Sequence, residues 1–238
     1  MANKNAEKDR KARVEEMRKA QQAAERRKNL LVVVASLAVV AVLVGVVFAV
    51  IRREQAAKDL ANIGLPSAAA ASCDPIITDE AAGGSVHVGP GTDQASKTTV
   101  EYKTVPPSSG EHYAQPAFPA SAFYTADDRP RLEALVHNLE HGYSIVWYSE
   151  SLPKAQQDEL KRISELVRDN DENVGAGKFV VTAWDPARGA FPAGKNLAIS
   201  HWGAKQGYRQ FCGSVSGSVI KDFVAKYPYT DSPEPNAQ

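Results

Sequence analysis

The sequence contains few of the sulfur-bearing residues, and its formal net charge is zero. Cys73 and Cys212 are its only cysteines, which excludes the Cys-x-x-Cys pair of thiol redox proteins and of many structural zinc sites. Both methionines, Met1 and Met17, precede the one long apolar run. A methionine-rich copper(I) carrier in the rest of the chain is therefore disfavoured. No Gly-x-Ser-x-Gly element occurs, and this argues against a serine hydrolase.

The zero net charge conceals an uneven distribution. Residues 1–29 hold ten Lys and Arg against five Asp and Glu, whereas the remainder holds eighteen against twenty-three. A basic head followed by an acidic body is typical of a segment that lies beside anionic lipid and is joined to a solvated domain. No broad basic surface is left for nucleic acid, so we expect a lipid bilayer as the partner and no nucleic acid.

One hydrophobic run is long enough to cross a membrane. Residues 30–51 carry no charge and would span about 33 Å as a helix. Arg52 and Arg53 follow directly, where a cleaved signal peptide would have a small-residue cleavage site, so we interpret the run as a single-pass anchor. The excess of Lys and Arg before it predicts a cytoplasmic N-terminus and a C-terminal domain outside the cell membrane.

These features divide the chain into five parts, of which one is a globular domain of ordinary size. Gly64 and Pro66 are expected to end any continuation of the membrane helix, and an alanine-rich stretch follows them. The expected parts are a basic cytoplasmic tail (1–29), the transmembrane helix (30–51), a membrane-proximal linker (52–72), the extracytoplasmic domain (73–230) and a disordered tail (231–238).

The two cysteines would both lie in an oxidising compartment. Well-separated thiols in such a compartment are usually paired, so we expect a disulfide between Cys73 and Cys212, with free thiols or metal ligation as the alternatives.

Hydrophobic periodicity predicts a mixed α/β domain, with helices packed on a mixed sheet. The first helix is expected to be capped by Asp127 or Asp128 and to end at Gly142. In order, the expected elements resemble a thioredoxin-like β-α-β-α-β-β-α core. They are a strand at 98–105, the helix ending at Gly142, a strand at 143–148, a helix at 153–168, strands at 178–184 and 196–202, and a helix at 215–227.

The candidate chemistry lies at the end of the first helix. His137 and His141 are four residues apart, so both imidazoles would point the same way on a helix, which is metal-ligand spacing. His112, in a loop, and His201, in a predicted strand, are candidates to join them, with Glu140 or His201 as a fourth ligand or a partner of the ligands. His87, in a glycine-rich stretch, is expected to be a surface or loop residue.

Two short motifs resemble the signatures of a known family: Ser109-Gly110-Glu111-His112, and residues 136–142 with the sequence Val-His-Asn-Leu-Glu-His-Gly. They are similar to those of an uncharacterised, often membrane-anchored bacterial family, number thirty-one-oh-five of the domain-of-unknown-function series. The resemblance extends over about residues 73–227. It implies domain boundaries and draws attention to the histidines, but it implies no activity.

Three hypotheses follow. The first is a noncatalytic or regulatory metal site, for which imidazole ligands favour zinc or copper(II). The second is a zinc-dependent hydrolase, because residues 137–141 spell HxxEH, in which Glu140 would act as the general base. The third is a cell-envelope interaction module in which the histidines only pack and form hydrogen bonds. Whether the chain is an enzyme stays open.

Overall fold

The computed structural model describes residues 2–81, 84, 86–170, 172–175 and 177–237. The chain divides into two compact units, Met1–Ala56 and Ala57–Gln238. The first is formed by α1 (Ala2–Lys58), in which Glu25–Phe48 is long and apolar enough to cross a membrane. The second is a mixed α/β domain, as expected from the sequence.

A six-stranded mixed sheet forms the centre of the domain, with strand order β1-β8-β7-β5-β6-β4. β5 pairs in parallel with β6 and antiparallel with β7, and β7 continues antiparallel to β8. The strands are β1 (Ile77–Glu80), β4 (Phe123–Tyr124), β5 (Ser144–Tyr148), β6 (Phe179–Ala183), β7 (Leu197–Trp202) and β8 (Gln206–Cys212). The central strands are buried on both faces, which requires covering layers on each side.

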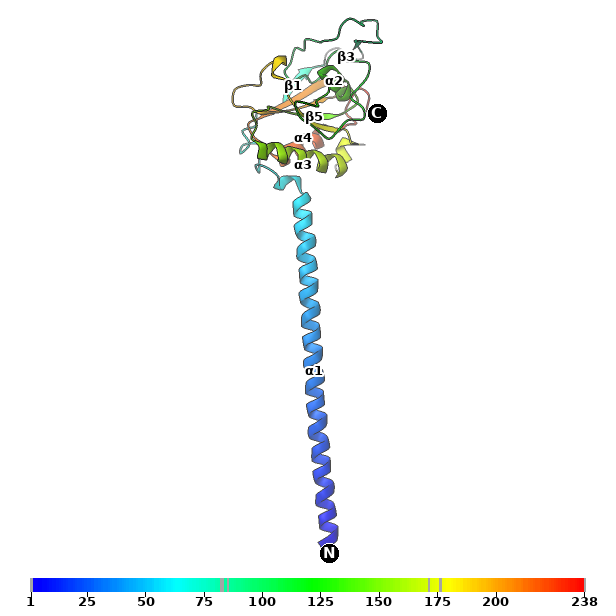
Figure 1. The fold of residues 1–238 in the computed structure, drawn as a ribbon, viewed down its shortest axis with the longest axis vertical. Coiled ribbons are helices and arrows are strands. Elements are labelled where there is room, and N and C mark those ends of the chain that lie inside the picture. The colour runs from blue at the N-terminus through cyan, green and yellow to red at the C-terminus, as the bar shows by residue number, and fades with distance from the viewer. Residues whose placement is uncertain (1, 82–83, 85, 171, 176, 238) are drawn as a thin grey trace. The chain divides into compact units, whose positions relative to one another are not determined.

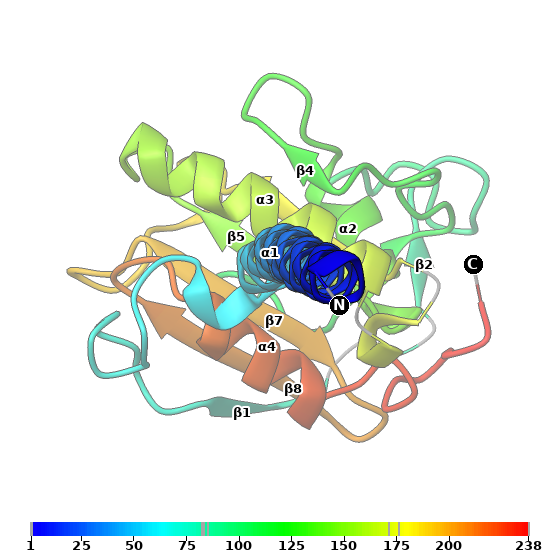
Figure 2. The ribbon, with the colours of Figure 1, turned by 90° about the horizontal axis from the view of Figure 1, so that it is seen from below.

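Helices cover both faces of this sheet. α3 (Lys154–Asn170) and α4 (Gly217–Lys226) lie against one face, where Ile163 and Phe223 belong to the same buried cluster as Val146 of β5. Figure 2 shows both helices in front of the strands. α2 (Leu132–Glu140) lies on the other face (Figure 1). There Leu135 and Leu139 share a buried cluster with Trp147. Short 3₁₀ turns occur at Leu60–Asn62 (η1), Glu172–Val174 (η2) and Pro186–Arg188 (η3).

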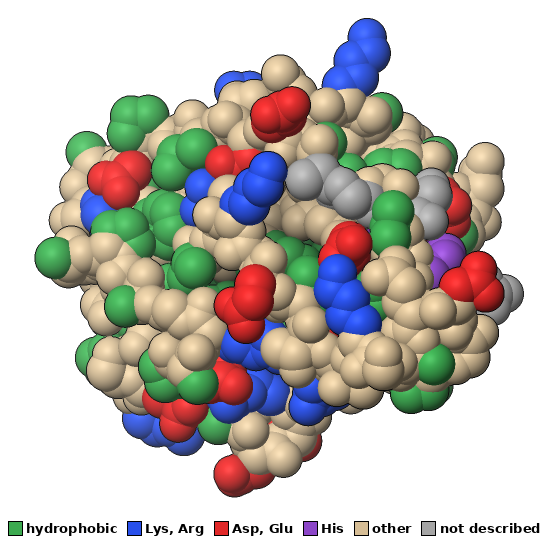
Figure 3. Space-filling model, turned by 90° about the horizontal axis from the view of Figure 1, so that it is seen from above, with side chains coloured by type: hydrophobic (Ala, Val, Ile, Leu, Met, Phe, Trp, Pro, Cys, Tyr) green, Lys and Arg blue, Asp and Glu red, His purple; other side chains and the backbone are tan. Residues whose placement is uncertain are grey.

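A third layer covers α2. It contains a two-stranded parallel sheet, β2 (His87–Val88) and β3 (His112–Tyr113). The face seen from above in Figure 3 carries interspersed acidic and basic side chains around a central hollow.

Several predicted elements are confirmed. The strands expected at 143–148, 178–184 and 196–202 are β5, β6 and β7, and the helices expected at 153–168 and 215–227 are α3 and α4. The strands β1 and β8 were not predicted.

The strand expected at residues 98–105 is absent, and with it the first element of the thioredoxin-like order. Its backbone groups are bonded by side chains instead of by a neighbouring strand. The Val100 N–H donates to the Glu133 carboxylate at 3.1 Å, and the Val100 carbonyl accepts from Arg188 at 3.3 Å. The alternating sequence of this segment therefore packs as an extended loop over α2.

The expected cap of α2 is also different. Asp128 accepts hydrogen bonds from the N–H and hydroxyl of Thr125, and so it closes a turn before the helix. The helix begins at Leu132 after Arg131, which forms no side-chain cap.

Part of the segment expected to be a linker packs on the domain. Leu60 and Ile63 are buried against the cluster under α3 and α4, and the Leu65 N–H donates to the Val215 carbonyl at 2.7 Å. The C-terminal segment expected to be disordered also makes contacts: the Asp231 carbonyl accepts from His201, and the Glu234 N–H donates to the Glu140 carbonyl.

Cys73 and Cys212 form the expected disulfide, across a sequence separation of 139 residues. It joins the segment before β1 to the end of β8. Closing so long a loop restricts the unfolded chain, and in the entropy model this stabilises the fold by about 5 kcal/mol.

We expect the double variant Cys73→Ala, Cys212→Ala to lower the free energy of unfolding by about 2–5 kcal/mol. Guanidinium unfolding of the full chain in detergent micelles, with and without reductant, measures the effect. Reductant should destabilise the natural sequence by a similar amount and leave the variant unchanged. Equal stabilities under oxidising conditions would contradict this prediction.

Candidate metal centre

α2 presents a polar side away from the large sheet. Val136 and Leu139 face the sheet, whereas His137 and Glu140, three residues apart, lie together on another side of the helix. That side is covered by the layer containing β3, so it is buried as well. His137 is 5% exposed and Glu140 is fully buried.

The short parallel sheet brings two further histidines to this side. His87 of β2 stands opposite His112 of β3 in the strand register, which places their ring centroids 4.9 Å apart. His112 is fully buried, and its ring centroid lies 4.7 Å from that of His137. His87 reaches solvent.

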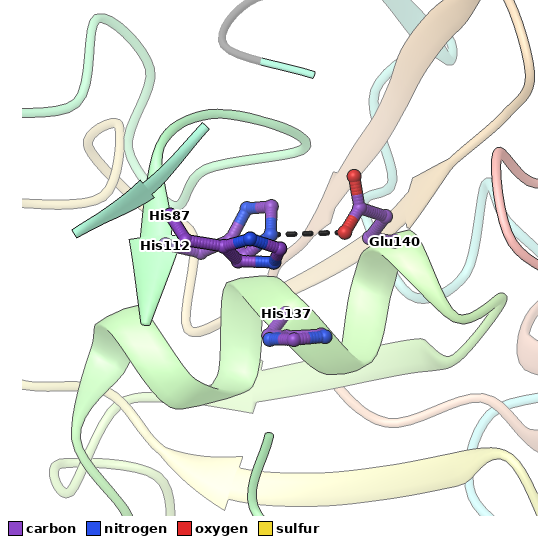
Figure 4. A group of neighbouring side chains, drawn as sticks. All are labelled: His87, His112, His137 and Glu140. Atoms are coloured by element: carbon purple, nitrogen blue, oxygen red, sulfur yellow. Dashed lines mark ion pairs between the residues drawn. The ribbon is translucent and has the colours of Figure 1, made fainter. Parts of the chain in front are cut away.

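Four potential ligands therefore converge from three segments of the chain (Figure 4). His87, His112, His137 and Glu140 each offer one atom, and these atoms all lie within 4.8 Å of one another. His112 Nε2 lies 2.9 Å from Glu140 Oε2, the contact drawn as a dashed line. Three imidazoles and one carboxylate form a donor set suited to zinc, copper(II) or another divalent transition metal.

In two of the imidazoles, Nδ1 is hydrogen-bonded to a backbone carbonyl. His112 Nδ1 lies 2.8 Å from the Gly110 carbonyl, and His137 Nδ1 lies 2.5 Å from the Tyr113 carbonyl. Because a carbonyl can only accept, each Nδ1 carries a proton, and Nε2 is left as the nitrogen that can bind a metal ion. Metal-bound histidines are commonly oriented in this way.

Gly110 makes the His112 contact possible. Its φ of 143° lies in the region that favours glycine, and a Cβ atom there would come within 2.8 Å of the Tyr102 ring. The glycine of the Ser-Gly-Glu-His motif is thus required by the backbone that holds His112.

The surroundings favour the neutral form of His137. Burial lowers the pKa of His137 to about 4, with smaller effects in the same direction from His112 and His141. His137 is consequently neutral at physiological pH, the form that binds a metal ion. His112 Nε2 is fully buried and, within the described residues, has no aligned hydrogen-bond acceptor or donor, although it lies within ion-pair distance of Glu140. A cation between these groups would bind both.

The site predicted from the sequence is only partly the site in the structure. His112, His137 and Glu140 come together. His141 is adjacent, since its Nε2 lies 2.8 Å from His137 Nε2, but it is not among the four mutually close groups. His87, expected in a surface loop, joins them. Its pairing with a residue 25 positions later in a two-residue strand leaves no periodic signal, and only its place between two valines hints at a strand.

His201 does not join the site. It alternates along β7 with Leu197 and Ile199, which pack under α3 and α4, so it faces the opposite side of the sheet from α2. Its Nε2 donates to the Asp231 carbonyl at 2.7 Å, and its Nδ1 lies 3.3 Å from the Ser144 hydroxyl. Burial also lowers the pKa of His201.

The position of Glu140 bears on the hydrolase hypothesis. A general base must lie within reach of a metal-bound water without occupying a ligand position itself. Glu140 Oε2 instead belongs to the group of ligand atoms and faces His112. The geometry favours Glu140 as a metal ligand over Glu140 as a base.

Comparison with known proteins gives a family but no described activity. The family model for "Protein of unknown function (DUF3105)" matches residues 93–238. No curated protein and no solved structure matches the chain.

The buried neutral His201 should make stability depend on pH. Because its pKa is lowered in the folded state, the unfolded chain takes up the proton first, and stability falls as the pH drops below about 6.5. The loss is at most about 1.4 kcal/mol per pH unit for one proton. We expect His201→Gln, whose amide can still donate to the Asp231 carbonyl, to remove this component. Urea unfolding of the full chain in detergent from pH 7.5 to 5 measures it, and identical slopes for both proteins would refute it.

Proposed function

We propose that this chain, which belongs to the DUF3105 family of proteins of unknown function, is a membrane-anchored metal-binding protein. Its metal ligands, which together form the inner site, would be His87, His112, His137 and Glu140. The observation that carries the proposal is the convergence of their four ligand atoms within 4.8 Å in a largely buried setting.

Zinc or copper(II) is the proposed metal. Imidazole nitrogens suit both ions, and one carboxylate completes a set of four ligands for a tetrahedral zinc site or a tetragonal copper site. The absence of methionine after residue 17 supports these ions over copper(I). The carboxylate of Glu140 would also balance part of the charge of a buried dication.

The proposed location is the outer side of a cell membrane. Three observations support it: the apolar part of α1, the ten Lys and Arg among residues 1–29, and the Cys73–Cys212 disulfide, which favours an oxidising compartment. In this arrangement residues 1–29 are the cytoplasmic tail and residues 30–51 the span. Contacts of Leu60 and Ile63 with the core support an outer domain that begins before residue 73.

The metal content of the full chain tests the proposal. We expect the protein, purified in detergent and dialysed against zinc or copper(II), to retain about one equivalent of one of them by elemental analysis. Metal at about 100 times its dissociation constant should add about 2.7 kcal/mol to the free energy of unfolding. A strong chelator should remove this gain.

The variants separate ligation from packing. His87→Gln changes a solvent-accessible ligand, so the apo-protein should fold normally. Its metal affinity should fall by at least the roughly 10- to 100-fold that the loss of a hydrogen-bond partner of a ligand costs. His201→Gln, which removes a histidine on the other side of the sheet, should leave the affinity unchanged. If the natural sequence retained neither metal and neither one raised the melting temperature, there would be no metal site.

A further inference from the structure

Resting on the metal site proposed above, we infer that His141 and Glu234 form an outer cation-binding position through which the metal ion enters and leaves the inner site. Neither residue is among the four mutually close ligands. Together they connect those ligands to solvent on the side where α2 ends.

The ligand atoms form a series from the surface inward. Glu234 Oε2 lies 3.6 Å from His141 Nε2, and His141 Nε2 lies 2.8 Å from His137 Nε2. Exposure falls along the same series: the side chain of Glu234 is 49% exposed and that of His141 is 9% exposed, whereas those of His112 and Glu140 are fully buried. A cation at the outer position therefore still meets water on this side, whereas His112 and Glu140 at the inner position are fully buried.

The C-terminal segment is fixed in place at this point. The Glu234 N–H donates to the Glu140 carbonyl at 3.0 Å. Lys178 is 5% exposed, and its Nζ donates to the carbonyls of His141, Pro235 and Ala237 at 2.7, 2.8 and 2.7 Å. The same ammonium group thus holds both the end of α2 and the chain on either side of Asn236. Glu234 is placed beside His141 by these backbone bonds.

The chemistry of transfer is an exchange of ligands. A dication bound by the Glu234 carboxylate and His141 Nε2 has His137 Nε2 within reach. It can bind His137 before it releases Glu234, so it is never without protein ligands. His137 then belongs to both positions, and His112 and Glu140 replace the outer ligands as the ion moves inward. No electron is transferred. His137 Nδ1 donates to the Tyr113 carbonyl, so the proton between the two Nε2 atoms is on His141. This proton passes to solvent when the ion binds His141 Nε2.

Electrostatic attraction favours entry of the cation beside Glu234 over entry beside His87. His87 also reaches solvent, but its side chain is an imidazole and carries no negative charge to attract a distant cation. An exposed carboxylate raises the local concentration of dications and their association rate. Raising the ionic strength should therefore slow metal uptake, because salt screens this attraction.

Zinc exchange kinetics of the full chain in detergent test this role. A residue on the path lowers the barrier equally in both directions, whereas a ligand of the resident ion changes the affinity. We expect Glu234→Gln to slow both zinc uptake, followed by stopped-flow, and zinc release to a chromophoric chelator by about 10-fold. The equilibrium affinity should be unchanged. His141→Gln should likewise slow both directions.

One control variant and three possible results test the outer position against the alternatives. Glu165→Gln removes an exposed carboxylate on α3, on the other side of the sheet, and should exchange zinc at the natural rate. If Glu234→Gln exchanged zinc at the natural rate, or if either Glu234→Gln or His141→Gln lost affinity, the outer position would be refuted. A natural chain that bound no zinc and no copper(II) would instead refute the metal site itself.

Discussion

The fold around the candidate site depends on the burial of α2 from both sides. Seven of the nine residues of this helix are buried, although only one side of it faces the large sheet. A buried polar group must find a partner, because an unsatisfied one costs about 1–3 kcal/mol. The partners of Glu133, His137 and Asn138 are backbone groups of the covering loops: the Val100 N–H, the Tyr113 carbonyl, and the N–H and carbonyl of Ala117. The polar side of α2 therefore organises a layer that has little secondary structure of its own.

Burying the ionisable side chains of this layer costs more free energy than burying its amide groups. Glu133 is fully buried, and its carboxylate is matched by Arg188 at 2.8 Å. Glu140, about two turns further along, faces His112, whose Nε2 lies 2.9 Å from Glu140 Oε2. A dication bound between His112 and Glu140 would place beside Glu140 the positive charge that Arg188 places beside Glu133.

Local regularity could be predicted from the sequence, and long-range pairing could not. The apolar runs of β5, β6 and β7 are properties of consecutive residues, so these strands were predicted correctly. The helical spacing of His137 and His141 likewise predicted that their imidazoles lie close together, and their Nε2 atoms are 2.8 Å apart. His87 was misplaced because its partner, His112, is set by a two-residue strand register that leaves no repeat in the sequence. His201 was included because its strand was correctly predicted, but the side of the sheet that it faces depends on strand order. The strand expected at residues 98–105 failed because side chains of α2 and η3 bond its backbone.

The same loops explain why a metal ion would have a structural effect as well as a chemical one. Among the described residues between 81 and 131, the strands are β2, β3 and β4, each two residues long. His87 and His112 are supplied by this region, whereas His137 and Glu140 lie on a helix packed against the main sheet. An ion bound by all four would tie the loops to the helix at one point. Loop closure costs entropy, and bonds that join distant segments offset that cost most where few other contacts exist. Metal binding should accordingly order the covering layer far more than the sheet, whose strands are already paired and buried on both faces.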